Sequence, residues 1–258
     1  DSMVLNCLSK ERASEYEQWI RVGMCLKNIG GDKLFDVFDE YSQKSENYEG
    51  KDECRKYWKG FKREGLTIGS LHYWAKRDNI DEYRKIIYSN LKNVIEKTID
   101  HGGMHDDLAN VVHGRFKDEF ICVDLKDHWL YFDGNKWIHC QKGYRLQRYL
   151  TGEVKEIFYQ YHKMYKEKMD ELQAQEKASE SETMDKYQKK AYSIYTRLKD
   201  VGYQRNIMES CKIKFHEERM MEKMDSKTHL LGFDNCIVDL SENIVREGRP
   251  EDYISMTN

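Results

Sequence analysis

Hydrophobic residues recur at helical spacing along the first hundred residues of the chain. The spacing predicts helices over residues 10–30, 33–41, 51–63 and about 81–100, and Thr67 is placed to cap one more. The whole chain contains one proline, against a usual share of about 5%, so little interrupts these helices. The pattern therefore predicts an all-α N-terminal domain over residues 1–100.

The period changes from helical to alternating at residues 120–125. Apolar and aromatic segments at residues 129–132 and 136–139 then flank Asp133-Gly134-Asn135, which is a strong turn signal. Trp129 and Trp137 are expected to pack across the resulting strands. This stretch predicts a small antiparallel hairpin.

Helical spacing returns after the hairpin and holds over most of the remaining chain. The predicted elements are helices over residues 146–172, 184–199 and 203–224 and short strands over 230–233 and 236–240. The polar residues 176–183 between two helices are expected to form an exposed helix end or a loop. The predicted fold is α+β and mostly α-helical, with the all-α N-terminal domain followed by a helix-rich domain with small antiparallel hairpins over residues 101–258.

The composition excludes several classes of protein. Of the 258 residues 34% are charged, but the formal net charge is only −3, so the chain is not a bulk electrostatic nucleic-acid binder, and only a local basic face stays open. No apolar run approaches the ~18 to 20 residues of a transmembrane helix, and the first residues lack a secretory signal. The seven cysteines include no C-x-x-C pair, which favours reduced thiols in an intracellular compartment.

Motifs of common catalytic sites are absent from the sequence, including the phosphate loop, G-x-G-x-x-G, G-x-S-x-G and H-E-x-x-H. The best metal-like cluster is formed by His101, His105, Asp106 and Asp107, because two imidazoles and two carboxylates can hold a cation. The glycines that flank His101 favour a domain junction instead, where short polar side chains cap the next helix. We therefore predict no metal site.

Cys122 and Cys140 lie on strands that the hairpin can bring together, and His139 adjoins the second cysteine. A nucleophilic cysteine needs a thiolate beside a base in an accessible cleft. Buried cysteines in a sheet are the commoner case, so we predict no catalytic residue and no cofactor for this chain.

The helix predicted over residues 51–63 separates its side chains into two faces. Cys54, Tyr57, Trp58 and Phe61 share a packing face, and the opposite face is basic. Residues 51–77 hold eight Lys or Arg against three Asp or Glu, a local balance of +5. Such a track suits contacts to phosphates, although a solvated charged face is the common alternative. The predicted DNA-binding residues are Lys51, Arg55, Lys56, Lys59, Lys62, Arg63, Lys76 and Arg77.

Two blocks of the sequence resemble known protein regions. The first includes Trp19-Ile-Arg-Val-Gly-Met-Cys-Leu26 and Leu66-Thr-Ile-Gly-Ser-Leu71, and it is similar to the small helical domain (the PriCT type) found C-terminal to the catalytic unit of many viral and plasmid primases. The second includes Trp129-Leu-Tyr-Phe-Asp-Gly134, Leu230-Leu-Gly-Phe-Asp-Asn235 and Gly248-Arg-Pro-Glu-Asp-Tyr253. It resembles the region that precedes the superfamily III helicase in poxvirus-type primase-helicases of large DNA viruses.

The resemblance implies a non-catalytic middle segment of a viral replication protein, because the family's primase core and phosphate-loop ATPase have no counterpart in this sequence. It implies binding to single-stranded or forked DNA and a link between the primase and a hexameric helicase ring. Homo-oligomers and other viral replication proteins are the implied partners, and ATP and Mg²⁺ are implied for the parent protein alone. An intracellular location is implied, either in the host cytoplasm at a viral factory or in the nucleus.

Two alternatives stay open from the residues. One is a metal-dependent nuclease or phosphoesterase that uses His101, His105, Asp106 and Asp107. The other is a structural oligomerisation scaffold whose helices over residues 146–199 carry subunit contacts without binding nucleic acid.

Overall fold

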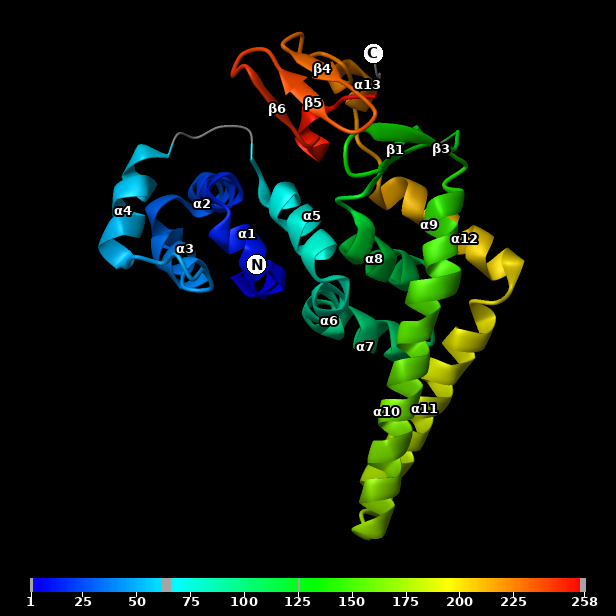
Figure 1. Ribbon diagram of the computed structural model, residues 1–258. Coiled ribbons are helices and arrows are strands. Elements are labelled where there is room, and N and C mark those ends of the chain that lie inside the picture. The colour runs from blue at the N-terminus through cyan, green and yellow to red at the C-terminus, as the bar shows by residue number, and fades with distance from the viewer. Residues whose placement is uncertain (1, 62–65, 125, 256–258) are drawn as a thin grey trace. The chain divides into compact units, whose positions relative to one another are not determined.

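The computed structural model describes residues 2–61, 66–124 and 126–255, and it divides the chain into two compact units (Figure 1). The first unit combines residues 1–89 with residues 134–136 and 224–258, and the second combines residues 90–133 with residues 137–223. These units do not follow the chain order of the predicted domains, 1–100 and 101–258. The C-terminal residues belong to the same unit as the N-terminal helices.

The first unit is built on short helices joined by tight turns. They are α1 (Lys10–Ser14), α2 (Tyr16–Gly30), α3 (Phe35–Ser42), α4 (Lys51–Gly60), α5 (Ile68–Asp78) and α6 (Ile80–Asn90), with 3₁₀ turns at Ser2–Cys7 and Gly31–Leu34. The side chain of Thr67 accepts a hydrogen bond of 3.1 Å from the Gly69 backbone N–H, so the predicted cap of α5 is confirmed. The helix predicted over residues 81–100 is instead broken at Leu91, between α6 and α7 (Lys92–Asp100).

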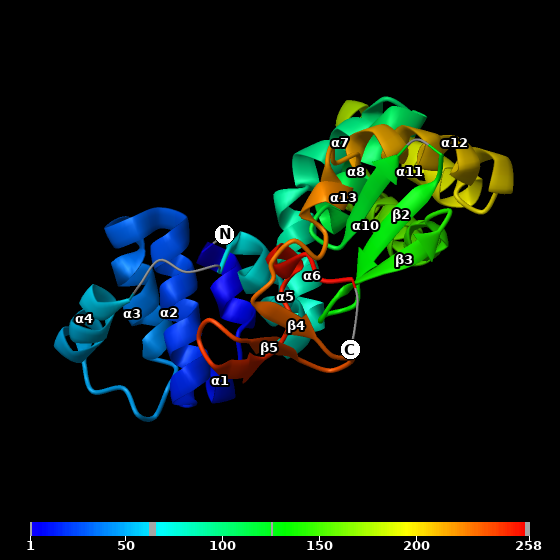
Figure 2. The same ribbon diagram turned by 90° about the horizontal axis from the view of Figure 1, so that it is seen from above.

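An aromatic core joins α2, α3 and α4, which lie together in Figure 2. The Phe38 ring centroid lies 5.1 Å from that of Trp19, 5.4 Å from that of Trp58 and 5.6 Å from that of Phe61. Gly23 of α2 faces this cluster, and a Cβ added there would lie 2.8 Å from Phe38 Cε2 and closer still to the Phe61 ring. Close packing therefore requires a glycine at this position.

A buried ion pair fixes α1 to the end of α5. Arg12 donates to both carboxylate oxygens of Asp78 at 2.7 and 2.9 Å, and each side chain is only 8% exposed. Burial by itself raises the pKa of Asp78, but hydrogen bonds from Arg12 and from the Ser9 backbone outweigh it and hold the pKa below its usual value.

The C-terminal part of the first unit forms a small antiparallel sheet of order β4-β5-β6. Its strands are β4 (Leu230–Gly232), β5 (Ile237–Asp239) and β6 (Ile244–Arg246), and its small core contains Leu230, Ile237 and Ile254. The first two strands confirm the prediction, but β6 was missed, because its central Val245 is 66% exposed and it contributes no residue to the small core.

The tip of the hairpin belongs to this unit because it bonds to the C-terminal segment. Asn135 donates from Nδ2 to the Phe233 carbonyl at 2.7 Å, and its Oδ1 accepts from the Gly248 N–H at 2.9 Å. A Cβ at residue 248 would lie 2.6 Å from Asn135 Cα. Gly248 is therefore required by the close approach of two backbone segments.

The second unit combines a three-stranded antiparallel sheet with helices. Its elements after α7 are α8 (His105–Phe116), β1 (Phe120–Asp124), β2 (His128–Phe132), β3 (Trp137–Gln141), α9 (Tyr144–Tyr149), α10 (Lys155–Ala174), α11 (Ala178–Arg197), α12 (Val201–Lys214) and α13 (Met220–Lys223). The sheet order is β1-β2-β3, which confirms the predicted hairpin. Trp137 packs across strands on Phe132, with ring centroids 5.5 Å apart, and Trp129 stands opposite Cys140.

Helices α10 and α11, each 20 residues long, form an antiparallel pair that Figure 1 shows side by side. The polar residues 176–183 do not form a loop over their length, since α11 already begins at Ala178 and Ser181 is buried against α10. A π-helical turn at Leu150–Val154 interrupts the helix predicted over residues 146–172. With two small sheets among these helices, the predicted mostly α-helical α+β class is confirmed.

Candidate nucleic-acid interface

Helix α4 separates a buried face from a basic face, as its sequence predicted. Cys54 and Trp58 are buried, and Phe61, which follows the helix, is buried too. Lys51, Arg55, Lys56 and Lys59 are exposed. The strip formed by Lys51, Arg55 and Lys59 repeats every four residues, so its cations are about 6 Å apart along the helix axis.

Three of the four cations on α4 have local partners. Lys51 pairs with Asp36 and Lys56 with Glu53, each at 2.7 Å, while the Arg55 guanidinium lies 4.3 Å from the centroid of the Phe35 ring. The hydrogen bond that Lys51 donates to Asp36 raises the pKa of Lys51, and the bond that Lys56 donates to Glu53 raises the pKa of Lys56. Because exposed ion pairs contribute little stability, a phosphate can replace either carboxylate at small cost.

Lys59 has no ion-pair partner among the residues that the structure describes. Its charge is therefore directly available to a phosphate. Lys62 and Arg63, which were also predicted to bind DNA, lie outside the described residues.

Lys76 and Arg77 lie at the end of α5 and not on α4. Lys76 is half-buried, and Arg77 forms an exposed ion pair with Glu247. Arg77 lines a groove of about 480 Å³ in the first unit. The described members of the predicted set therefore fall into two groups, one on α4 and one at this groove.

The groove contains arginines that the sequence reasoning missed. Arg12, Arg21 and Arg246 line it together with Arg77, but its wall also holds four carboxylates, those of Glu15, Glu17, Asp78 and Glu247. Arg246 is held by Asp239 and Asp252. The groove is therefore close to neutral, and most of its arginines serve to hold the fold together.

Arg249 adds another cation to this part of the first unit. Burial and the nearby charge of Arg246 lower its pKa to about 10. It stands in the Gly248-Arg-Pro-Glu-Asp-Tyr253 segment, which was singled out for its resemblance and not for its charge.

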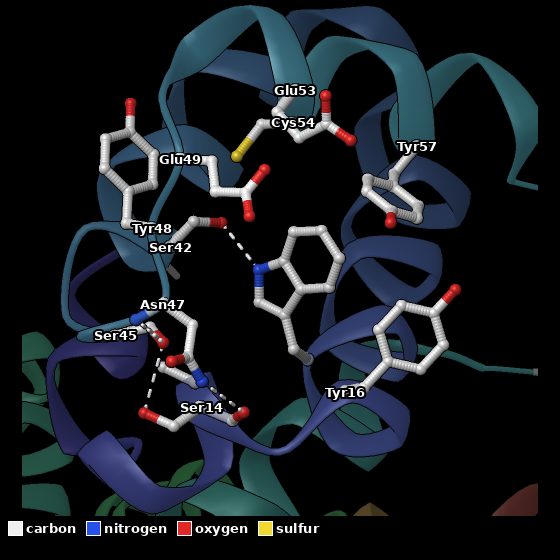
Figure 3. Close-up of a pocket in the computed structure, with 12 residues that line it drawn as sticks. Ser14, Tyr16, Ser42, Ser45, Asn47, Tyr48, Glu49, Glu53, Cys54 and Tyr57 are labelled. Carbon is white, nitrogen blue, oxygen red and sulfur yellow. Dashed lines mark hydrogen bonds between the residues drawn. The ribbon is translucent and has the colours of Figure 1, made fainter.

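A pocket beside α4 is the second feature that the sequence did not reveal (Figure 3). Its volume is about 190 Å³, and Tyr16, Trp19, Tyr48 and Tyr57 contribute rings to its wall. Tyr57 was assigned to the packing face of α4, and it is half-buried at this pocket instead of being fully covered. Tyr16 was counted among the apolar positions of the helix predicted over residues 10–30, but it follows the break between α1 and α2 at Glu15 and is 58% exposed.

Two of the four residues of the metal-like cluster bond to each other, and the other two contact residues outside the cluster. His101 bonds through Nδ1 to Asp107 at 2.8 Å, Asp106 pairs with Lys214 at 2.7 Å, and the His105 ring packs on Tyr203. Within the described parts of the chain, no three His, Cys, Asp or Glu side chains are arranged to hold a metal ion. The geometry does not favour the nuclease alternative.

The two cysteines considered as nucleophiles are separated by strand β2. Trp129 stands opposite both Cys122 and Cys140 in the sheet, and both thiols are buried. Burial raises the pKa of Cys122 to about 11. His139 is exposed and directed away from this buried layer, so the arrangement lacks a thiolate beside a base.

Comparison with known proteins defines the class to which these two units belong. Residues 2–75 match the family described as Primase C terminal 2 (PriCT-2), and residues 109–257 match the family described as D5 N terminal like. The chain belongs to the D5 N terminal like family, and it is a D5-type primase-helicase region of the kind found in large DNA viruses. The resemblance inferred from the two sequence blocks is confirmed.

Viral relatives align over almost the whole chain. The chain is 25% identical to "Putative helicase L207/L206" of Acanthamoeba polyphaga mimivirus, over 98% of this chain and 26% of that protein. It is 23% identical to "Putative helicase 022R" of Frog virus 3 (isolate Goorha), over 96% of this chain and 28% of that protein. It is 26% identical to "Putative helicase 121R" of Invertebrate iridescent virus 3, over 98% of this chain and 30% of that protein.

The chain thus spans less than a third of the length of each of these relatives. Among the helices that the structure describes, none combines the length and the apolar character needed to cross a membrane.

Proposed function

We propose that this chain is a non-catalytic, DNA-binding middle segment of a viral primase-helicase. In the parent protein it connects the primase to a hexameric helicase ring, and ATP and Mg²⁺ serve the parent's catalytic domains. Single-stranded or forked DNA and other replication proteins of the virus are its partners. The family membership and the names of the relatives support the replication context, and the surface of the first unit supports DNA binding.

The exposed strip Lys51, Arg55 and Lys59 is the observation that carries the proposal. Its cations are about 6 Å apart along the helix axis. Successive phosphates of a stacked strand rise about 3.4 Å along its axis and wind around it, which separates them by about 6–7 Å. The strip can therefore contact successive phosphates of one strand without a change in the helix. The buried Cys54 and Trp58 on the other face keep the helix in this orientation.

Replacement of the strip tests this proposal. The triple variant Lys51→Ala, Arg55→Ala and Lys59→Ala is expected to bind a fluorescent single strand at least tenfold more weakly at moderate salt. Each lost phosphate contact removes about 0.7 from the slope of log K against log salt for a single strand, so the slope should fall by about 2. Fluorescence anisotropy over a salt series measures both quantities.

A matched control removes three exposed lysines from the α10–α11 pair, namely Lys166, Lys168 and Lys186. It changes the net charge by the same amount and should bind like the parent chain. Equal affinities and slopes for the parent and the strip variant would refute the proposed contact. Stable oligomers without DNA affinity at any salt would favour the structural scaffold.

A further inference from the structure

We propose that the pocket beside α4 binds one unstacked nucleobase and prefers a base that carries an exocyclic amino group. The inference rests on the proposed DNA binding and adds to it a site where the protein contacts a base of the strand. Every residue used in the argument belongs to the first unit.

The wall of the pocket offers an aromatic platform. The ring centroids of Trp19 and Tyr57 are 5.2 Å apart, those of Tyr16 and Tyr57 are 5.9 Å apart, and those of Tyr16 and Trp19 are 6.3 Å apart. A volume of about 190 Å³ equals that of roughly six water molecules, which suits one ring system and excludes a whole nucleotide. Aromatic side chains at such sites bind bases by stacking, and every base has a face that can stack.

Most donors in the pocket are already occupied, and the hydroxyls of Tyr16 and Tyr57 are the exceptions among the described residues that line it. Trp19 donates from Nε1 to Ser42 Oγ at 2.8 Å, Ser42 donates to the Phe38 carbonyl at 2.7 Å, and Tyr48 donates to Asp39 at 2.9 Å. Asn47 donates through its side-chain amide to the Ser14 carbonyl at 3.4 Å. A ligand in this pocket therefore finds few free hydrogen-bond donors.

The charged groups in the pocket are acceptors. Glu49 has no hydrogen-bond or ion-pair partner among the described residues, and Figure 3 shows its carboxylate turned into the pocket. Glu53 lines the same wall, and Lys56 is its one ion-pair partner among the described residues. Carboxylates accept hydrogen bonds from amino groups of bases, so adenine, cytosine and guanine fit this pocket better than thymine does.

The position of the pocket on α4 connects base and phosphate binding. Glu53 and Tyr57 line the pocket, whereas Arg55 and Lys56 stand one or two positions away on the exposed side of the same helix. Lys56 is 2.7 Å from Glu53, at the rim of the pocket. The carboxylates repel phosphates and the cations attract them, so a bound strand turns a base inward and leaves its backbone on the basic face.

Aromatic rings together with carboxylates are also the chemistry that binds a lysine or arginine side chain. The four cations on the exposed face of α4 oppose the approach of a basic peptide. These cations therefore favour a nucleic-acid ligand over a basic peptide, and the test below includes a basic peptide as the alternative ligand.

The test compares short oligothymidylates that differ at one central position, which holds thymine, adenine, cytosine, guanine or an abasic site. Anisotropy is measured with the parent chain and with Glu49→Gln and Tyr16→Ala, and with Tyr192→Ala on α11 as an exposed-tyrosine control. Strands with one amino-bearing base are expected to bind the parent about tenfold more tightly than the all-thymine strand. Glu49→Gln should reduce this preference while leaving binding to the all-thymine strand unchanged.

Tyr16→Ala should weaken binding to strands with any central base and bring them close to the abasic strand, because the platform is lost. Tyr192→Ala should bind like the parent. If oligothymidylate binds through the α4 strip but neither the central base nor Tyr16→Ala changes the affinity, the pocket proposal is wrong and the proposed function stands. If no oligonucleotide binds, both fail, and oligoarginine binding that is lost in Tyr16→Ala and Glu49→Gln would assign the pocket to a basic peptide.

Discussion

Substitution of Gly23 by alanine tests the aromatic core that positions α4. The added Cβ would lie 2.8 Å from Phe38 Cε2 and closer still to the Phe61 ring, so both rings must move. Overpacking costs about 1–3 kcal/mol, and so short a contact with two packed rings lies in the upper part of that range, about 2–3 kcal/mol, while replacement of glycine within a helix returns about 1 kcal/mol. We expect a net loss of about 1–2 kcal/mol in the free energy of unfolding.

Thermal or urea unfolding followed by tryptophan fluorescence measures this loss, since Trp19 and Trp58 both contact the affected core. A melting temperature lowered by about 3–8 °C corresponds to the expected change. The matched control is Gly60→Ala at the end of α4, where no heavy atom lies within 4 Å of the added Cβ. Its effect should stay within about 0.5 kcal/mol.

A Phe61→Leu substitution provides the second arm of the test. Because leucine vacates part of the space that the new Cβ needs, Gly23→Ala combined with Phe61→Leu should be more stable than the sum of the two single effects predicts. Equal unfolding midpoints for Gly23→Ala and Gly60→Ala, or strict additivity with Phe61→Leu, would show that the contact between Gly23 and the rings is not tight.

Two further predictions concern contacts that hold the first unit together. Asp78→Asn should cost about 3–5 kcal/mol at neutral pH, because it leaves Arg12 buried without a counter-ion. The pKa of Asp78 is lowered in the folded state. The stability that the pair contributes is therefore present above about pH 4 and is lost as the pH falls through the folded-state pKa. Urea unfolding at pH 7 and pH 3 should therefore show a difference between parent and variant that shrinks in acid, and a constant difference would contradict it. Gly248→Ala should cost about 3 kcal/mol, because the added Cβ meets the Asn135 backbone, which cannot rotate away. Hydrogen exchange should show lower protection of residues 230–254 in this variant, and unchanged protection would refute the assigned contact.

Much of the fold follows from local signals in the sequence. The Thr67 cap, the alternation before Asp133-Gly134-Asn135 and the apolar face of α4 each predict an element that the structure contains. These signals depend on residues close in sequence, and their physical causes act within a few residues. Strand β6 was not detected, because its central Val245 is exposed and its last residue is the ion-paired Arg246.

The missed features depend on contacts between distant segments. Gly248 and Asn135 are 113 positions apart, and nothing in either local sequence shows that their backbones touch. The two tryptophans were expected to pack across strands, but their partners, Cys140 for Trp129 and Phe132 for Trp137, depend on the register, which cannot be read from an alternating pattern alone.

The candidate site also has one part that the sequence predicted, the basic face of α4, and one part that it did not, the pocket. The charge segregation on α4 was visible because it depends on helical spacing alone. The pocket needs Tyr16 and Trp19 from α2, Glu49 from the segment before α4, and Tyr57 from α4. Such a convergence of α2 and α4 depends on tertiary packing, so the sequence showed the basic face and not the pocket beside it.

The salt dependence of single-strand binding by the unmodified chain tests the central claim most directly. Contacts from Lys51, Arg55, Lys56 and Lys59 on α4 predict a slope of about −3 for log K against log salt, at about 0.7 for each phosphate. A linear decrease with a slope of this size or steeper supports DNA binding by the first unit. Absence of binding at low salt, or an affinity that does not change with salt, would contradict it.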